Sequence, residues 1–528
     1  MDTLAPRGDG LQELARQVAR RSPFPHDHYE VAAIVESLGW TDHQVQTTFG
    51  YPDVFALARA IYDGLKAAPT VLPHVPRKTL PWHQALGRAV RHFFRGLVFA
   101  LPMAVSVAAM LVVRYSLWAY QYFTLEVATA VAIATMLSLL VTGGFIQSIA
   151  RRGLMYVEMD EYYVARRVTM RLMAVGTAVA MLVGLGFGLV NLVFLIYPWR
   201  MVGWALLYYL LLCTVWLAVG LLYILKRELL LTVIFALGIA AVGILHEVFR
   251  LTIMLAQGLA LAFTSGASLL VARRTFATYE RRRVPGVEYV PLPRPSLLLY
   301  ALLPYFIYGF GYFLLLYTDR ILAWTADAPY MPYFFWFRGD YELGLDWAIL
   351  ILVLPLGVVE MAIVRFGDLL RQRQALHPAS DVEGFNRWFL AFHTRWLWVF
   401  AAVVTASAAL VYWGTIAVER SGVLAVPLFA NRISYWVFGW AVLGYALIAA
   451  GLMNVLLLFC LSRPEPVLRV LGLAWLVDVV VGFVMSRQLG YQWAVCGLVA
   501  GALAFFLLST YWCRSILREL DYQYYASL

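Results

Sequence analysis

The sequence predicts an all-α fold: a polytopic membrane protein with about twelve transmembrane helices in two six-helix lobes, preceded by a small helical cytoplasmic domain. Of its 528 residues, 62% are hydrophobic and only 14% are charged, which is far outside the range of soluble globular proteins. About twelve apolar windows contain roughly 20 residues each, enough to cross about 30 Å of hydrocarbon. A polar stretch precedes the first window, and another separates the sixth from the seventh.

A polar linker over 273–296 divides the apolar windows six plus six. Its arginine cluster and its prolines predict an extended cytoplasmic segment between a first lobe over 90–272 and a second lobe over 297–515. Two lobes around a central path are a common plan among secondary transporters. The expected spans cover 96–118, 123–148, 171–196, 201–224, 229–246, 251–272, 297–318, 345–366, 396–418, 433–461, 466–486 and 491–513.

Positive charge is distributed unevenly between the two sets of short loops. One set carries about 22 Lys and Arg residues and the other about seven, a bias that places the richer side in the cytoplasm. We therefore expect an inner-membrane protein with both termini on the cytoplasmic side. No cleavable signal pattern precedes the first apolar run near Phe93. Most of the net charge of +10 comes from the Lys and Arg residues of the cytoplasmic loops, which lie next to membrane lipids. A nucleic-acid partner is therefore not needed to explain the charge.

Residues 1–75 show apolar side chains at helical spacing, which predicts a cytoplasmic bundle of three or four helices. Within it, "VAAIVESLGWTDHQVQTTFGYPDVFALARAIYDGL" resembles the helix-turn-helix of TetR-type repressors. A DNA-reading helix needs Lys or Arg to neutralise phosphates, yet "TDHQVQTT" has neither. We therefore expect a docking module for a cytoplasmic partner, or a passive fused domain.

A second segment on the cytoplasmic side, 380–396, carries aromatic residues at helical spacing. Two interpretations stay open for it. It forms either a helix on the membrane surface that turns into the ninth span, or a simple continuation of that span.

Two adjacent charges stand out in "LYTDRILAW" at the end of the seventh span. Asp319 and Arg320 point about 100° apart on a helix, so they cannot simply neutralise each other and each needs its own partner. A charge near the bilayer centre costs several kcal/mol and normally faces protein or a water-filled cavity. In the alternative interpretation the span ends at Thr318 and both charges lie at the outer interface.

Two further carboxylates fall within expected spans. Asp478, in "AWLVDVVVGF", lies near the middle of the eleventh span and is the best candidate for an ion or proton site, with a hydrogen bond to a neighbouring helix as the alternative. Glu360 lies in the inner third of the eighth span. It is either a gate residue or an interfacial side chain that reaches the membrane surface.

Aromatic residues gather in "APYMPYFFWFRGDYELGLDW", between the seventh and eighth spans on the outer side. Such clusters normally form the aromatic belt of the membrane interface. Aromatic faces with interleaved charged groups, here Arg338, Asp340 and Glu342, also bind sugar rings. Arg338, Tyr341 and Glu342 are therefore candidates for an exit path for a glycan.

Motifs of enzymes and cofactor sites are missing from the sequence. It has no Walker A sequence, Rossmann fingerprint, HExxH or nucleophile elbow, and its four cysteines show no metal or redox spacing. We expect no enzyme activity, no cofactor and no metal. Energy for transport would come from an ion gradient, from a partner, or from polymer synthesis next to the protein.

Three stretches carry a resemblance to a known family: "VTGGFIQSIARRGLMYVEMDEYYVARRVT", "YGFGYFLLLYTDRILAW" and "DYELGLDWAILILVLPLGVVE". They resemble segments of the Pel exopolysaccharide exporters, which belong to the multidrug/oligosaccharidyl-lipid/polysaccharide flippase superfamily. This resemblance implies two six-helix lobes and export of a polysaccharide together with a cytoplasmic glycosyltransferase and membrane accessory proteins. It also implies that Asp319 and Arg320 line the cavity between the lobes or lock an outer gate by pairing across it.

Two other functions remain open from the sequence. A flippase for a lipid-linked glycan would move one short unit in each cycle. A membrane scaffold or receptor would use the spans only to anchor the N-terminal bundle and to assemble a polysaccharide synthase complex, with no transport activity. Charges within the membrane and the six-plus-six division favour transport.

Overall fold

A computed structural model describes residues 7–22, 25, 27–67, 82–281, 292–327, 333–376, 381–422 and 431–525. All the named secondary-structure elements in these ranges are helices, and eleven of them are long and apolar enough to cross a membrane. A further helix, Trp82–Val113, contains the shorter apolar run Leu101–Met110. The prediction of an all-α, multi-span protein is therefore confirmed.

The first lobe packs around α8, which is the most enclosed of its helices because its neighbours cover it on several sides. Its tightly packed core includes Tyr208, Leu212 and Leu217 of this helix, all of them fully buried. The elements are α5 (Trp82–Val113), α6 (Leu125–Glu158), α7 (Tyr162–Phe194), α8 (Trp199–Ile224), α9 (Glu228–Gly243), the π-helical turn η1 (Ile244–Val248) and α10 (Ile253–Glu280).

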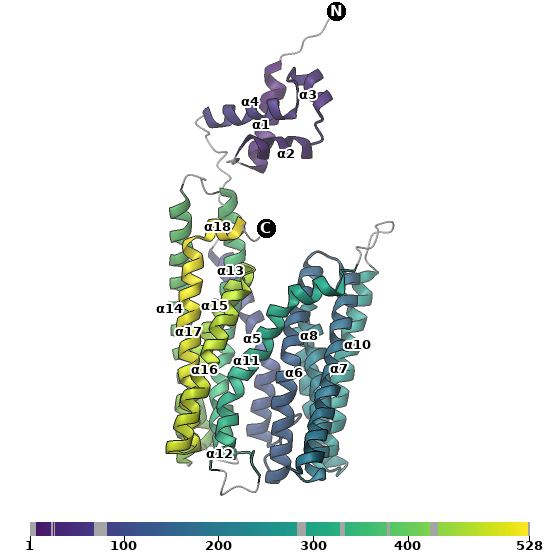
Figure 1. Cartoon of the computed structure of the whole chain (residues 1–528), viewed down its shortest axis with the longest axis vertical. Coiled ribbons are helices and arrows are strands. Elements are labelled where there is room, and N and C mark those ends of the chain that lie inside the picture. The colour runs from purple at the N-terminus through teal and green to yellow at the C-terminus, as the bar shows by residue number, and fades with distance from the viewer. Residues whose placement is uncertain are drawn as a thin grey trace, which may run out of the picture. The chain divides into compact units, whose positions relative to one another are not determined.

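The second lobe begins with α11, which lies against α6 of the first lobe and against α16 of its own lobe (Figure 1). Its elements are α11 (Pro295–Trp324), α12 (Gly339–Ile349), the 3-10 turn η3 (Leu350–Leu352), α13 (Val353–Leu376), α14 (Val382–Arg420), α15 (Arg432–Cys460), α16 (Pro464–Leu489), the 3-10 turn η4 (Tyr491–Ala494), α17 (Val495–Arg518) and α18 (Leu520–Tyr525).

Pro355 explains why the eighth span is built from two helices. Proline has no N–H to donate to the carbonyl four residues earlier, so it breaks the hydrogen-bond ladder of a continuous helix. The chain passes here through the turn η3, and the Ser407 hydroxyl on α14 donates to the Ile351 carbonyl at 2.7 Å. A neighbouring helix thus satisfies the carbonyl that the proline leaves free.

The segment 380–396 does not form a separate helix, because its described residues belong to α14. This helix is uninterrupted over 39 residues, which at 1.5 Å per residue makes it about 58 Å long, well over the hydrocarbon thickness. The interpretation of a distinct helix on the membrane surface is therefore wrong, and continuation of the ninth span is correct. Near its start, the Asn386 amide donates to Asp521 of α18 at 2.8 Å.

The N-terminal residues form four short helices around one core. They are α1 (Arg7–Arg21), α2 (His28–Ser37), α3 (Asp42–Phe49) and α4 (Val54–Ala67). Val18, Val35 and Leu57 of this core have no exposed surface. The Asp42 carboxylate accepts from the Val54 backbone N–H at 2.8 Å, which ties α3 to the start of α4.

Most of both lobes belongs to one compact unit, formed by residues 92–363 and 395–515. They meet at two crossings where helix backbones approach closely. On α6 and α11, a Cβ atom added to Gly143 would lie 2.7 Å from the Gly309 carbonyl oxygen. On α5 and α13, a Cβ atom added to Gly96 would lie 2.9 Å from the Gly357 Cα atom. No larger residue fits at these crossings without moving a backbone.

Polar contacts join the lobes on both sides of these crossings. Towards one end, the Phe337 N–H donates to the Thr129 hydroxyl at 3.2 Å, and the Tyr197 hydroxyl donates to the Phe335 carbonyl at 2.9 Å. Burial raises the pKa of Tyr197 to about 12, so it remains a neutral donor at physiological pH. Towards the other end, the Arg151 guanidinium donates to the Ser462 hydroxyl at 3.1 Å.

Candidate functional site

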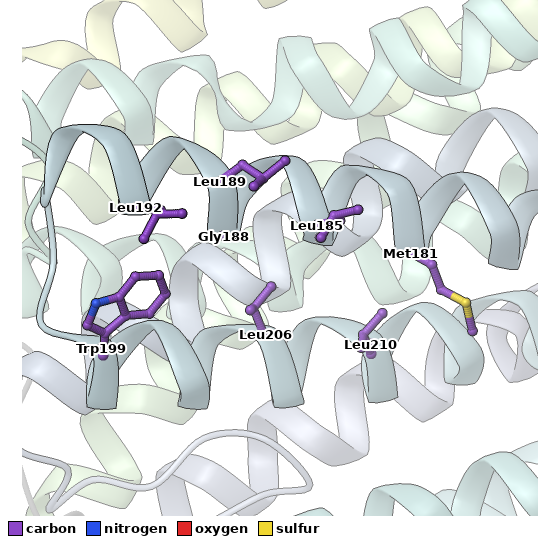
Figure 2. A pocket seen from close by; sticks show the side chains of 9 residues that line it. Met181, Leu185, Gly188, Leu189, Leu192, Trp199, Leu206 and Leu210 are labelled. Carbon is purple, nitrogen blue, oxygen red and sulfur yellow. The ribbon is translucent and has the colours of Figure 1, made fainter.

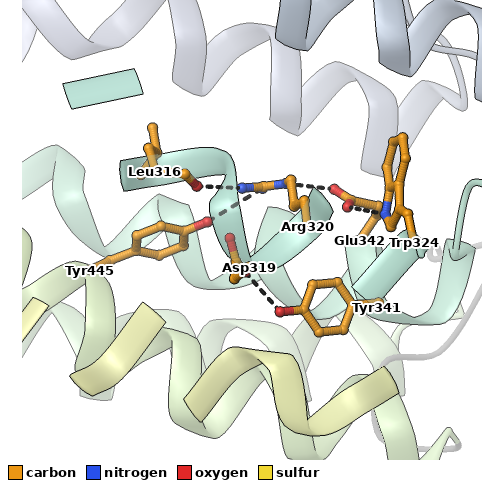
Figure 3. A network of polar contacts seen from close by, with 7 residues as sticks. All are labelled: Leu316, Asp319, Arg320, Trp324, Tyr341, Glu342 and Tyr445. Atoms are coloured by element: carbon orange, nitrogen blue, oxygen red, sulfur yellow. Dashed lines mark hydrogen bonds and ion pairs between the residues drawn. The ribbon is translucent and has the colours of Figure 1, made fainter. Parts of the chain in front are cut away.

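Asp319 and Arg320 both lie inside helix α11, which continues as far as Trp324. Asp319 has no exposed surface and Arg320 is 6% exposed. The described chain therefore buries both charges in the second lobe rather than ending the helix at Thr318. Figure 3 shows that the two side chains leave α11 in different directions and reach different partners.

Arg320 forms a buried ion pair with Glu342 on α12. Its Nε donates to Glu342 Oε2 at 2.9 Å, and its two Nη atoms donate to the Tyr445 hydroxyl and the Leu316 carbonyl, each at 3.3 Å (Figure 3). Glu342 Oε1 also accepts from the Trp324 indole N–H at 3.0 Å. Because each charge has several partners, the desolvation cost of the pair is offset by hydrogen bonds.

Asp319 is held separately from this ion pair. Its Oδ2 accepts from the Tyr341 hydroxyl at 2.7 Å, while its Oδ1 is buried without a hydrogen-bond partner among the described residues. Tyr341 and Glu342 are adjacent on α12, just as Asp319 and Arg320 are adjacent on α11. Two neighbouring residues on one helix thus bind two neighbouring residues on the other.

All side-chain partners of this network belong to the second lobe, in α11, α12 and α15. We call the four residues Asp319, Arg320, Tyr341 and Glu342 the polar network. In this structure it does not pair across the two lobes, contrary to the expectation of a lock between them. It fixes three helices of one lobe to one another, close to the aromatic core around Trp324 and Tyr445.

Asp478 lies on α16, near the polar network. It is fully buried, and neither of its carboxylate oxygens has a hydrogen-bond partner in the described part of the chain. The negative charge of Asp319 acts on it electrostatically. On its other side α17 approaches closely, since a Cβ atom added to Gly497 would lie 2.7 Å from Asp478 Oδ1.

The remaining sequence candidates lie apart from the polar network. Glu360 is half-buried on α13, with its Cβ at the crossing that contains Gly96. Arg338 donates to the Ala326 carbonyl at 3.0 Å and covers the ring of Tyr491 at 4.3 Å. The structure therefore brings together four of the seven candidates, places Asp478 beside them, and leaves Glu360 and Arg338 elsewhere.

Three residues of the site were missed by reasoning from the sequence. Tyr445 and Trp324 supply hydrogen bonds to the ion pair, and Asp346 lies within electrostatic range of Glu342 and Arg320. Asp346 follows Glu342 by four residues in an apolar segment, so both face the same side of α12. The spacing of these two acids could have identified Asp346 from the sequence. The residues around Tyr445 contain no comparable pattern.

The outer aromatic cluster is mostly used for packing. The rings of Phe335 and Phe337 lie 5.0 and 5.3 Å from the ring of Trp324, and those of Tyr333 and Trp336 lie 5.3 Å apart. Among the described rings of this cluster, Phe334 is the exception, with 71% of its surface exposed. This arrangement favours an interfacial aromatic belt over an open platform for sugar rings.

Three tyrosines follow one another along α11, and the first of them lies at the boundary between the lobes. Tyr305 is covered by the Arg151 guanidinium of the first lobe, 4.9 Å from its ring centre. Tyr308 follows one turn later and Tyr312 another turn later, with ring centres 6.0 Å apart. Both Tyr305 and Tyr308 also pack on Phe459 of α15.

An apolar groove with a volume of about 410 Å³ lies between α7 and α8 (Figure 2). Its lining has almost no polar surface, and it contains none of the charged candidates. Hydrocarbon chains of membrane lipids fit such a surface, whereas sugars and ions do not. Its walls include Met181, Gly184, Leu185, Gly188, Leu189, Leu192, Trp199, Leu206 and Leu210.

Comparison with known proteins gives matches among solved structures. No protein-family model and no curated protein matches the sequence. An outward-facing multidrug resistance MATE family transporter of the MOP superfamily matches with a TM-score of 0.54 at 12% identity, over 82% of this chain and 96% of the other. A MATE protein in complex with MaD5 matches with a TM-score of 0.55 at 14% identity, over the same two shares.

A third match is a mutant of the Vibrio cholerae MATE transporter VcmN. Its TM-score is 0.52 at 13% identity, over 84% of this chain and 98% of the other. The chain has the MATE fold. At these identities the likeness establishes the two-lobed architecture of the MATE fold, which agrees with the division that the sequence predicts.

Proposed function

We propose that this protein is an inner-membrane transporter that exports an exopolysaccharide or a lipid-linked glycan by alternating access. The observation that carries the proposal is the largely buried polar network inside one lobe of a MATE fold. Neighbours with this fold are named as transporters, one of them in an outward-facing conformation. Alternating access requires two lobes that can change their relative position while each stays intact.

The buried charges favour a transporter over a scaffold. Charged side chains within a membrane are costly, and they commonly occur where an ion or a substrate moves. A protein that served only to anchor other subunits would need no Asp319, Arg320, Glu342 or Asp478 in its interior.

The substrate class rests on two observations. The sequence resembles Pel exopolysaccharide exporters in three stretches, and two of them contain the polar network. Tyr305 of α11 lies at the boundary between the lobes, and Tyr308 and Tyr312 follow it along the same helix. Rings uncovered by a separation of the lobes would stack on sugar rings. The apolar groove on α7 and α8 would hold membrane lipid.

Partners follow from the same proposal. A polymer exporter receives its substrate from a cytoplasmic glycosyltransferase, and the N-terminal bundle α1 to α4 is the part of the chain suited to dock it. The charge bias of the loops places both termini on the cytoplasmic side, where this docking would occur. Membrane accessory proteins would complete the export apparatus.

A gene deletion in the host tests the function. We expect the deletion strain to lose secreted polysaccharide and to retain polymer or its lipid-linked precursor inside, and the wild-type gene to restore secretion. A gene with Asp319→Asn should not restore it, although the variant protein is present and folded in the membrane. The matched control is Asp340→Asn, which changes an exposed carboxylate at the start of helix α12.

Unchanged polysaccharide in both fractions of the deletion strain would remove the assignment and favour a scaffold or a transporter of other molecules. Normal export by the Asp319→Asn variant would leave the buried carboxylate with a structural role alone.

A further inference from the structure

Asp478 is a buried acid to which the proposed function gives no role of its own. It lies near the middle of α16, with α11 on one side and α17 on the other. Its side chain has no exposed surface, and both carboxylate oxygens are without a hydrogen-bond partner among the described residues. An ionised carboxylate in that position would have lost its hydration and gained nothing in return.

No described cation compensates for Asp478. On α11 the nearest positive charge, Arg320, is engaged with Glu342, and the group on α11 whose charge acts on Asp478 is the acid Asp319. On α16 itself, Arg487 is bound to the Leu322 carbonyl and to the Thr325 hydroxyl at the end of α11.

The facing side of α17 offers glycines instead of charges. A Cβ atom added to Gly497 would lie 2.7 Å from Asp478 Oδ1, and one added to Gly501 would lie 2.6 Å from Asp478 Cβ. The backbone of α17 thus closes directly over the carboxyl group. A bare metal ion needs several oxygen ligands around it, and this packing leaves little room for them. A proton needs no additional space.

We propose that Asp478 is a proton-binding site of the second lobe, occupied in this closed arrangement of α11, α16 and α17. The carboxyl group is neutral while it is buried, because an ionised carboxylate without a hydrogen-bond partner would lose its hydration. When α16 and α17 separate and admit water, the O–H bond breaks, its electrons stay on the carboxylate, and the proton passes to water. Burial of Asp478 would then follow binding of the next proton.

This step would link a proton gradient to the movement of the lobe. It goes beyond the proposed function because proton binding can be measured without knowing the transported molecule. The site also differs from the polar network in having no fixed partner, so its occupancy can change without breaking the Arg320–Glu342 ion pair.

Infrared spectroscopy of the full chain in lipid nanodiscs tests the proposal. The carbonyl stretch of a protonated carboxyl group is separate from the bands of carboxylates. At neutral pH the difference spectrum between wild type and Asp478→Asn should contain such a band, and it should disappear in wild-type protein as the pH is raised. Asp340→Asn, at an exposed acid, should leave the band unchanged.

Two results would overturn the proposal. One is a wild-type spectrum with no protonated-carboxyl band assignable to Asp478 at neutral pH. The other is a sodium-dependent rise in thermal stability that Asp478→Asn abolishes, which would assign the site to a metal cation. Asn has the same shape as a protonated Asp, so the variant should fold, and an unchanged elution profile in size-exclusion chromatography checks this.

Discussion

The ion pair between Arg320 and Glu342 shows which parts of the site could be predicted from the sequence. Adjacent positions on a helix point about 100° apart, so separate partners for Asp319 and Arg320 followed from geometry alone. The identity of those partners did not follow, because Tyr341 and Glu342 lie 22 residues away and Tyr445 lies 125 residues from Arg320. Only the packing of α11, α12 and α15 brings them together.

Removing one member of this pair should be more damaging than removing both. Glu342→Gln leaves the Arg320 guanidinium buried without its carboxylate, so we expect a loss of about 3–5 kcal/mol in stability, as for other broken buried pairs. Thermal unfolding followed by tryptophan fluorescence in detergent would show a clear fall in the melting temperature.

A double variant serves as the matched control. Arg320→Met combined with Glu342→Leu removes both charges and keeps apolar volume, so its melting temperature should lie closer to that of wild type. If Glu342→Gln unfolds at the wild-type temperature, the pair is not the electrostatic anchor of α11 on α12.

The helices themselves were largely predictable from hydropathy, because each must be long and apolar enough to cross the membrane. The expected span 201–224 corresponds to α8 (Trp199–Ile224), and 433–461 corresponds to α15 (Arg432–Cys460). Hydropathy could not show where a helix continues beyond the hydrocarbon, and this is why α14 extends further than the expected span 396–418. A charged or aromatic extension of a membrane-spanning helix has the same residue pattern as a separate helix on the membrane surface.

The close crossing of α6 and α11 was also beyond prediction from the sequence. Glycines are frequent in membrane helices, and only the structure distinguishes their surroundings. Gly309 touches the backbone of α6, whereas a Cβ atom added to Gly266 of α10 would meet no neighbour within 4 Å among the described residues. The structural role of a glycine in such a helix therefore depends on which neighbouring atoms its Cα faces.

This contrast gives a prediction with an internal control. Gly309→Ala would push its new methyl group into the Gly143 backbone, so it should cost about 1–3 kcal/mol in stability and reduce export. Gly266→Ala should be neutral or slightly stabilising, because alanine favours a helix by up to about 1 kcal/mol over glycine. Melting temperatures and export should be compared in both; equal behaviour of the two variants would contradict the role of the crossing.

At the scale of the whole molecule, the division into two lobes was predictable because a polar stretch of the sequence interrupts the apolar windows at their midpoint. The arrangement of the lobes was not, since it depends on contacts between residues far apart in the sequence. Phe337 contacts Thr129 across 208 positions, and Arg151 contacts Ser462 across 311. The hydrophobic periodicity of one segment does not indicate which distant residues of the sequence it will contact.

These contacts suggest how the central claim of alternating access can be tested. If the lobes must separate near Thr129 and Phe337 during each cycle, a covalent bond there should stop the cycle. The Phe337 backbone nitrogen lies 3.2 Å from the Thr129 hydroxyl oxygen, so cysteines introduced at these two positions would face each other across the contact between the lobes. In the orientation that we propose from the charge bias, this end faces the outer, oxidising side of the membrane.

The most direct measurement is therefore polysaccharide export by a Thr129→Cys/Phe337→Cys variant, in a background with Cys460 and Cys496 replaced by serine. We expect export to stop when the disulfide forms and to return when a reductant opens it, with each single-cysteine variant active throughout. Export at the wild-type rate by fully cross-linked protein would contradict alternating access between these lobes.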